Sequence, residues 1–111
     1  LRSLQYATSS TLRDQIDRGL VTPDHPNHEL LTAWLDRWLT WVSAAFLDGY
    51  LEVAAEQPFV PDDPEHLRLL LDAFLVEKAV YELGYEMNNR PAWVGIPLAG
   101  IAQVLEREAT R

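Results

Sequence analysis

Apolar side chains recur every third or fourth residue along most of the chain, and no stretch alternates residue by residue. The first pattern is typical of helices that bury one face, whereas half-buried strands would alternate. The pattern predicts four helices, which cover residues 1 to 19, 29 to 56, 64 to 88 and 97 to 107. The sequence therefore predicts an all-α fold, a bundle of about four helices.

Local signals mark where these helices start. The third helix has the clearest one, because Asp62 or Asp63 suits the N-cap, Pro64 fits the first helical position and Glu65 suits the first turn. Residues 22 to 29 contain two prolines, an aspartate and an asparagine, a composition typical of a loop. This loop separates the first two predicted helices.

Other residues mark the helix ends. Gly19 is typical of the residue that follows a helix. Asn88 and Asn89 tolerate the left-handed conformation that often ends a helix, and Pro91 prevents continuation. The third helix is therefore expected to stop before Pro91.

The two longest predicted helices carry most of the large apolar side chains. Trp34, Trp38 and Trp41 form a stripe at helical spacing, and such aromatic stripes usually belong to a core. The helix over residues 64 to 88 is apolar on more than one side, which indicates burial against several neighbours. Both helices are therefore expected to pack tightly.

Length, charge and composition narrow the class of protein. With 111 residues, 48% of them apolar and 23% charged, the chain fits one globular domain. A net charge of −8 argues against nucleic acids or anionic membranes as binding partners. The absence of cysteine excludes thiol chemistry. No apolar run approaches the length needed to span a membrane. The chain begins at Leu1 rather than Met, so we interpret residues 1–111 as one helical subdomain of a larger protein. We expect this larger protein to be cytoplasmic.

One face of the third predicted helix changes character along its length. It begins with leucine and phenylalanine and continues with Lys78, Tyr81, Tyr85 and Asn89. Phenol rings and an ammonium suit the wall of a sugar pocket, because sugars have apolar ring faces and a rim of hydroxyls. On spacing alone a plainer interpretation is favoured, in which Lys78 pairs with Glu82 or extends into solvent and the tyrosines lie at the edge of a core.

Other candidate residues form no recognisable catalytic or metal motif. His25, His28 and His66 are expected in solvent, because no further ligand completes a zinc site. Glu82 and Glu86 lie one helical turn apart and are expected on a solvated face. The chain has no glycine-rich phosphate loop, nucleophile elbow or kinase-type aspartate motif, and therefore no complete active site.

The string LLDAFLVEKAVYELGYEMNNRPAWVGIPL at residues 70 to 98 resembles the C-terminal end of bacterial maltokinases, including those fused to trehalose synthase. Its distinctive part is E-K-A-x-Y-E-x-x-Y-E-x-x-N-R-P-x-W-x-x-I-P-L. The opening LRSLQYA and the central AAFLDGYL are also similar, so the resemblance covers most of the chain and is weakest from residue 8 to 30. Gly84 and Gly95 depart from the family pattern, which has larger residues there.

The resemblance implies an activity and a place in a larger fold. Maltokinases are similar to aminoglycoside phosphotransferases and, more distantly, to protein kinases. They use ATP and Mg²⁺ to phosphorylate the anomeric hydroxyl of maltose, and the maltose 1-phosphate feeds α-glucan and glycogen synthesis. The family's catalytic and metal-binding aspartates precede the part that this chain resembles, so the 111 residues would be the helical end of the C-lobe and inactive alone.

The resemblance also assigns roles to particular residues. In the family, the lysine and two tyrosines of the K-x-x-Y-x-x-x-Y pattern line the maltose pocket, and they correspond to Lys78, Tyr81 and Tyr85. Glu82, Asn89 and Arg90 match the motif as supporting residues, and Asn89 and Arg90 would fix the helix end.

Two other functions stay open. The chain could be a non-catalytic helical module that docks a partner such as trehalose synthase through its tryptophan-rich helix. That helix would then show a contiguous exposed apolar patch on the face of Trp34, Trp38 and Trp41, whereas a sugar pocket should be concave around Lys78 and Tyr85. It could also belong to a kinase of the same fold that phosphorylates another sugar or an aminoglycoside.

Overall fold

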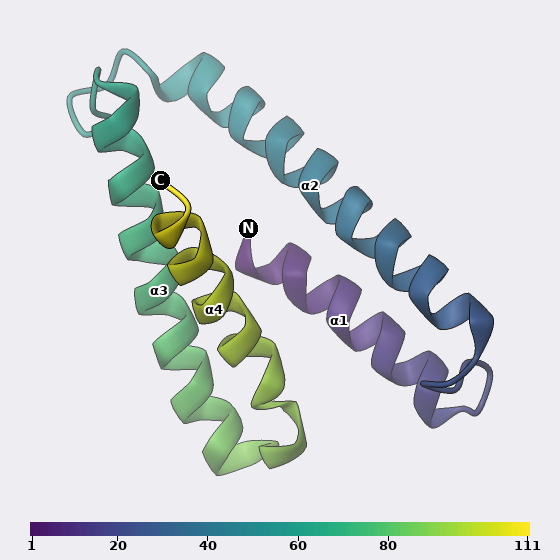
Figure 1. Cartoon of the computed structure of the whole chain (residues 1–111). Coiled ribbons are helices and arrows are strands. Elements are labelled where there is room, and N and C mark those ends of the chain that lie inside the picture. Colours follow the sequence, from purple (N-terminus) through teal and green to yellow (C-terminus); the bar gives the residue numbers. More distant parts are fainter. The chain divides into compact units, whose positions relative to one another are not determined.

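The structure is a computed structural model that describes all 111 residues, and every regular element in it is helical (Figure 1). The elements, in chain order, are α1 (Arg2–Asp17), α2 (Pro26–Ala54), α3 (Pro64–Asn89), the 3₁₀ helix η1 (Pro91–Trp93) and α4 (Gly95–Ala109). The predicted all-α fold with four helices is confirmed. No helix is long and apolar enough to cross a membrane.

The predicted helix boundaries are mostly correct. Asp63 is the N-cap of α3, and its side chain accepts a hydrogen bond of 2.8 Å from the backbone N–H of Glu65, with Pro64 at the first helical position. Gly19 follows α1 with φ +71°, a left-handed conformation that favours glycine. The loop prediction for residues 22 to 29 is wrong in its second half, because Pro26 begins α2.

The end of α3 differs from the expectation for Asn88 and Asn89. Neither asparagine adopts a positive φ. Instead, their side-chain amides donate to the carbonyls of Gly84 and Tyr85, each at 2.9 Å, and so satisfy acceptors of the last turn. The chain leaves the helix through Arg90, which has φ −139° and ψ 70° and precedes Pro91.

The helices divide into two compact units. The first contains residue 1 and residues 3–52, and the second contains residue 2 and residues 53–111. In the first unit, α1 and α2 run antiparallel (Figure 1). Side chains of both helices line a hollow of about 460 Å³. The residues around this hollow are Ala7, Thr8, Thr11, Trp34, Leu35 and Trp38.

The tryptophan stripe is not a core, so that expectation was wrong. Trp34, Trp38 and Trp41 are 58%, 44% and 64% exposed. The physical reason is the composition of the facing helix, since α1 offers small side chains such as Ala7 and Thr11 where a tight core would need large apolar groups.

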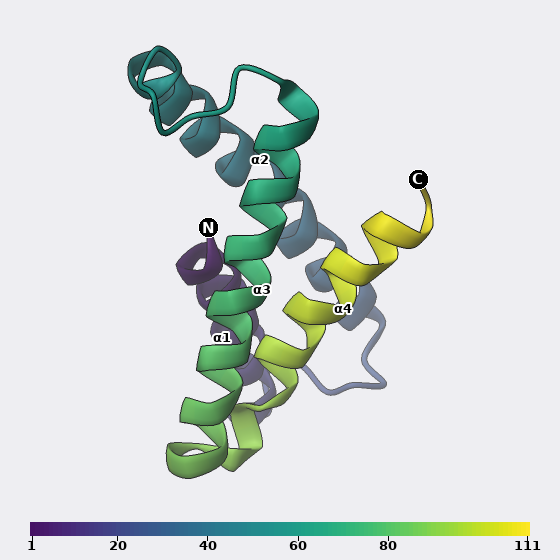
Figure 2. The same ribbon diagram turned by 90° about the vertical axis from the view of Figure 1, so that its left-hand side faces the viewer.

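In the second unit, α3 and α4 form a helical hairpin joined by η1 (Figure 2). Its buried centre is small and consists of residues from both helices: Ala79, Ile96, Pro97, Gly100 and Val104. Within α3 only Asp72, Ala79 and Glu86 are buried, so the expectation that α3 packs against several neighbours was wrong. These three residues are seven apart and lie on one face, because two turns of helix bring the chain back to the same side.

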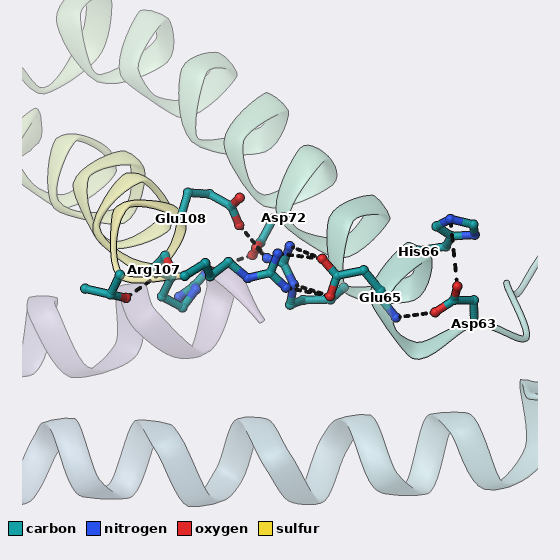
Figure 3. Close-up of polar contacts among 9 residues, drawn as sticks. Asp63, Glu65, His66, Asp72, Arg107 and Glu108 are labelled. Atoms are coloured by element: carbon teal, nitrogen blue, oxygen red, sulfur yellow. Dashed lines mark hydrogen bonds and ion pairs between the residues drawn. The ribbon is translucent and has the colours of Figure 1, made fainter.

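Ion pairs tie the start of α3 to the end of α4 (Figure 3). Asp72 accepts from Arg68 at 2.8 Å and from Arg107 at 2.7 Å. Glu65 accepts from Arg111 at 2.5 and 2.6 Å, and Arg68 also contacts Glu65 and Glu108. The hydrogen bonds from Arg111 and then Arg68 lower the pKa of Glu65 from 4.5 to about 2.

This ion-pair cluster predicts a pH dependence below the physiological range. The pKa of Glu65 is lower in the folded state, so its stabilising contribution is present above about pH 4.5 and is lost as the pH falls towards 2. A carboxyl ¹³C NMR titration should give a pKa near 2 for Glu65, and Arg111→Gln should move it back towards 4.5. Arg18→Gln on α1 is the control and should leave this titration unchanged; an ordinary pKa in the unsubstituted chain would contradict the predicted pairing.

Candidate functional site

The three residues singled out from the sequence share one exposed face of α3. Tyr81 is 66% exposed and Tyr85 is 49% exposed, and Lys78 is exposed one turn before them. The ammonium of Lys78 lies 4.6 Å from the centroid of the Tyr81 ring, a cation–π distance. Of the two possibilities in the plainer interpretation, the structure shows Lys78 extending into solvent, while Glu82 pairs with Arg2. The face thus presents two phenol rings, two hydroxyls and one cation to solvent.

Asn89 and Arg90, which the sequence motif suggested as supporting residues, lie at the C-terminal end of α3. The Asn89 side chain holds the backbone of Tyr85 through the 2.9 Å bond to its carbonyl. The Arg90 guanidinium lies 5.6 Å from the centroid of the Tyr85 ring and 4.2 Å from that of Trp93. The last turn of α3 and the start of η1 are therefore held around Tyr85.

Glu86 is buried and the Glu82 side chain is mostly covered, so the expectation that they lie on a solvated face was wrong. Glu86 is only 1% exposed and accepts from Arg90 at 2.9 and 2.5 Å. Glu82 accepts two hydrogen bonds from Arg2, at 2.9 and 2.6 Å. A guanidinium therefore faces each of these sheltered carboxylates and offsets the cost of its burial.

The Arg2 guanidinium reaches Glu82 by passing directly over Gly100 of α4. A Cβ built at Gly100 would lie 2.1 Å from an Arg2 nitrogen, which no relaxed contact permits. The absence of a side chain at Gly100 therefore makes room for this ion pair.

Sequence reasoning named these carboxylates but missed that they are covered, although one signal could have revealed the burial of Glu86. Asp72, Ala79 and Glu86 recur every seven residues, and the small Ala79 between two acids marks a face in close contact with a neighbouring helix. The strong preference for arginine, eight against one lysine, also fits buried carboxylates, because guanidinium groups bind them in two-point geometry.

The site residues lie on an open helix surface, so the concave wall expected around Lys78 and Tyr85 for a sugar pocket is not formed by these residues. Elements of the second unit bring Lys78, Tyr81 and Tyr85 together but leave them exposed, whereas the 460 Å³ hollow belongs to the first unit and is lined by Trp34 and Trp38. No three His, Asp or Glu side chains gather where they could hold a metal ion. The three histidines therefore do not combine with acids into a metal site.

Neither the known protein-family models nor the solved structures contain a match to this chain. The resemblance to maltokinases consequently rests on the sequence motif of residues 70 to 98 alone.

Proposed function

We propose that the chain is the C-terminal, acceptor-binding part of a maltokinase, which transfers the γ-phosphate of ATP to maltose and yields maltose 1-phosphate for α-glucan and glycogen synthesis. The observation that carries this proposal is the common exposed face of Lys78, Tyr81 and Tyr85 on α3. Lysine and tyrosine side chains at a true core position would be covered, whereas those of a binding surface must be reachable.

Each residue of this face has a chemical role in the proposal. The Tyr81 and Tyr85 rings stack on the apolar faces of the two glucose units, and their hydroxyls bond to sugar hydroxyls. Lys78 donates to the sugar rim with its ammonium group. Glu82, Asn89 and Arg90 support α3 through the contacts described above.

In the proposal, ATP binding, Mg²⁺ binding and phosphoryl transfer belong to other segments of a longer parent chain. The 111 residues bring together no metal-holding cluster, so we derive no step through ATP or Mg²⁺ on them. Because the Lys78 face is open, the opposite wall of the sugar pocket also belongs to the parent. We place the parent in the cytoplasm, fused to trehalose synthase or associated with it.

The decisive experiment measures ADP release by the full-length parent with ATP and Mg²⁺, with and without maltose. Release that depends on maltose supports the proposal. ADP release that depends on a different sugar or on an aminoglycoside would show that the parent is a kinase with an acceptor other than maltose. The absence of any acceptor-dependent release would overturn the kinase proposal and favour the second candidate below.

Tyr85→Ala tests the site within the same enzyme. The substitution removes a stacking surface for maltose, so the KM for maltose should rise at least tenfold while the KM for ATP stays nearly unchanged. Tyr50→Ala is a matched control, because Tyr50 on α2 has almost the same exposure, 48%. Equal KM values for maltose in the Tyr85 variant and the unsubstituted enzyme would remove Tyr85 from the site.

A second candidate function is docking of a partner through α2. It is favoured by the exposure of Trp34, Trp38 and Trp41, which leaves indole rings in solvent next to an apolar hollow. In this alternative the chain is a non-catalytic module, and trehalose synthase is the partner to test.

Binding measurements with purified trehalose synthase examine this alternative. If α2 is the docking surface, the double substitution Trp38→Ser/Trp41→Ser should weaken binding at least tenfold, because buried tryptophans often dominate interfaces. Phe59→Ser removes a comparably exposed aromatic ring outside the helices and should have little effect. Absence of binding by the unsubstituted chain would exclude this partner.

A further inference from the structure

The carboxylate of Glu86 is the most deeply buried acid of the molecule. Glu86 is 1% exposed, and its two oxygens accept from Nε and Nη2 of Arg90 at 2.9 and 2.5 Å. This parallel, two-point pairing fixes both the position and the plane of the guanidinium. Arg90 is thus anchored from the interior of the second unit, one helical turn from its partner.

The anchored guanidinium contacts two aromatic rings. It lies 4.2 Å from the centroid of the Trp93 ring and 5.6 Å from that of the Tyr85 ring. Both distances fall within the range of cation–π attraction. Arg90 therefore links a buried carboxylate to Tyr85, whose ring is half exposed on the candidate face.

The backbone around Tyr85 is held by separate contacts. The Asn89 amide bonds to the Tyr85 carbonyl at 2.9 Å, and the Arg90 N–H bonds to the Glu86 carbonyl at 2.8 Å. Arg90 then turns the chain out of the helix into Pro91 and η1. With the backbone fixed in this way, the remaining freedom of Tyr85 is the rotation of its side chain, and Arg90 is placed to restrict it.

We infer that Arg90, oriented by buried Glu86 and stacked on Trp93, is a positioning residue that holds the Tyr85 ring in its sugar-binding orientation. The inference rests on the proposed function of Tyr85. A ring held in place before the sugar arrives loses less conformational freedom on binding, so the contact raises affinity without Arg90 touching the sugar. Lysine cannot replace arginine here, because an ammonium provides neither the two-point pairing nor a flat stacking surface.

Arg90→Lys in the full-length parent tests this role. The charge is retained, but the orientation of Tyr85 is not, so the KM for maltose should rise about three- to tenfold while kcat and the KM for ATP stay nearly unchanged. Arg37→Lys is the matched control, because Arg37 also lies over a tryptophan, 5.9 Å from the Trp34 ring centroid, but on α2. The control should leave all three constants unchanged.

NMR spectra of the 111-residue chain supply a readout that general destabilisation would not give. In Arg90→Lys, the ring signals of Tyr85 and the indole N–H of Trp93 should shift, whereas the Tyr81 ring signals stay in place. If Arg90→Lys does not fold, Glu86→Gln provides a second route, because its amide keeps the size of the side chain but weakens the pairing with Arg90.

The outcomes separate this inference from the proposed function. If Tyr85→Ala raises the maltose KM and Arg90→Lys does not, the positioning role is overturned and the sugar site stands. If Arg90→Lys changes the KM values for maltose and ATP equally, Arg90 acts only on overall structure and the inference is again overturned. If Tyr85→Ala has no effect, the proposed site fails first and the positioning role fails with it.

Discussion

Arg2→Met is expected to lower the free energy of unfolding of the second unit by about 3 kcal/mol, because it leaves the sheltered Glu82 carboxylate without its guanidinium. The side chains of Arg2 and Glu82 are only 8% and 12% exposed, so water replaces little of the lost interaction. Urea denaturation followed by circular dichroism measures the change.

Two further variants test whether the burial of the Arg2–Glu82 pair causes the expected loss of stability. Arg18→Met removes the same group from the exposed pair with Asp14 on α1, and it should cost well under about 1 kcal/mol. The double variant Arg2→Met/Glu82→Leu removes both charges and should recover much of the lost stability. If Arg2→Met and Arg18→Met cost the same, the pair with Glu82 is not sheltered in solution.

Gly100→Ala is expected to destabilise the same unit by about 1 kcal/mol, because the new methyl group occupies the path of the Arg2 guanidinium and the end of that side chain must shift while it is paired with Glu82. Either Arg2 moves away from Glu82 or α4 shifts, and both weaken the ion pair. The same substitution at Gly84 in α3 is the control. No atom lies within 4 Å of a Cβ at Gly84, so alanine there should stabilise the helix by up to about 1 kcal/mol.

The sign of the Gly100→Ala effect should reverse when Arg2 is absent. In an Arg2→Ala background the methyl group meets no guanidinium, and the higher helix propensity of alanine should then stabilise α4. A double-mutant cycle from four urea denaturation curves gives this coupling directly. Additive effects of the two substitutions would show that Arg2 does not pass over Gly100.

The helices were predictable from sequence because their signals are local. The three- and four-residue apolar spacing, the Asp63 cap followed by Pro64, and Gly19 after α1 all act within one or two turns. The common face of Lys78, Tyr81 and Tyr85 was predictable for the same reason, because helix geometry alone places these residues together.

Apart from the seven-residue spacing of Asp72, Ala79 and Glu86, burial was not predictable, because it depends on which distant segment covers each face. Glu82 pairs with Arg2, which lies 80 positions earlier in the sequence, and no local sequence pattern predicts that ion pair. Trp38 is exposed because α1 places small residues opposite it, a property of the neighbour and not of α2. Apolar periodicity shows which face of a helix could be buried. Whether that face is buried depends on the element that packs against it.

The scarcity of lysine gives the candidate face a distinctive chemical reactivity. Lys78 carries the only side-chain amine among the 111 residues, and it stands exposed on α3 beside Tyr81. Reagents and enzymes that acylate lysine side chains therefore have a single target in this chain. Acetylation would neutralise Lys78 and remove its cation–π contact in one step, while the arginines that hold the buried carboxylates stay untouched.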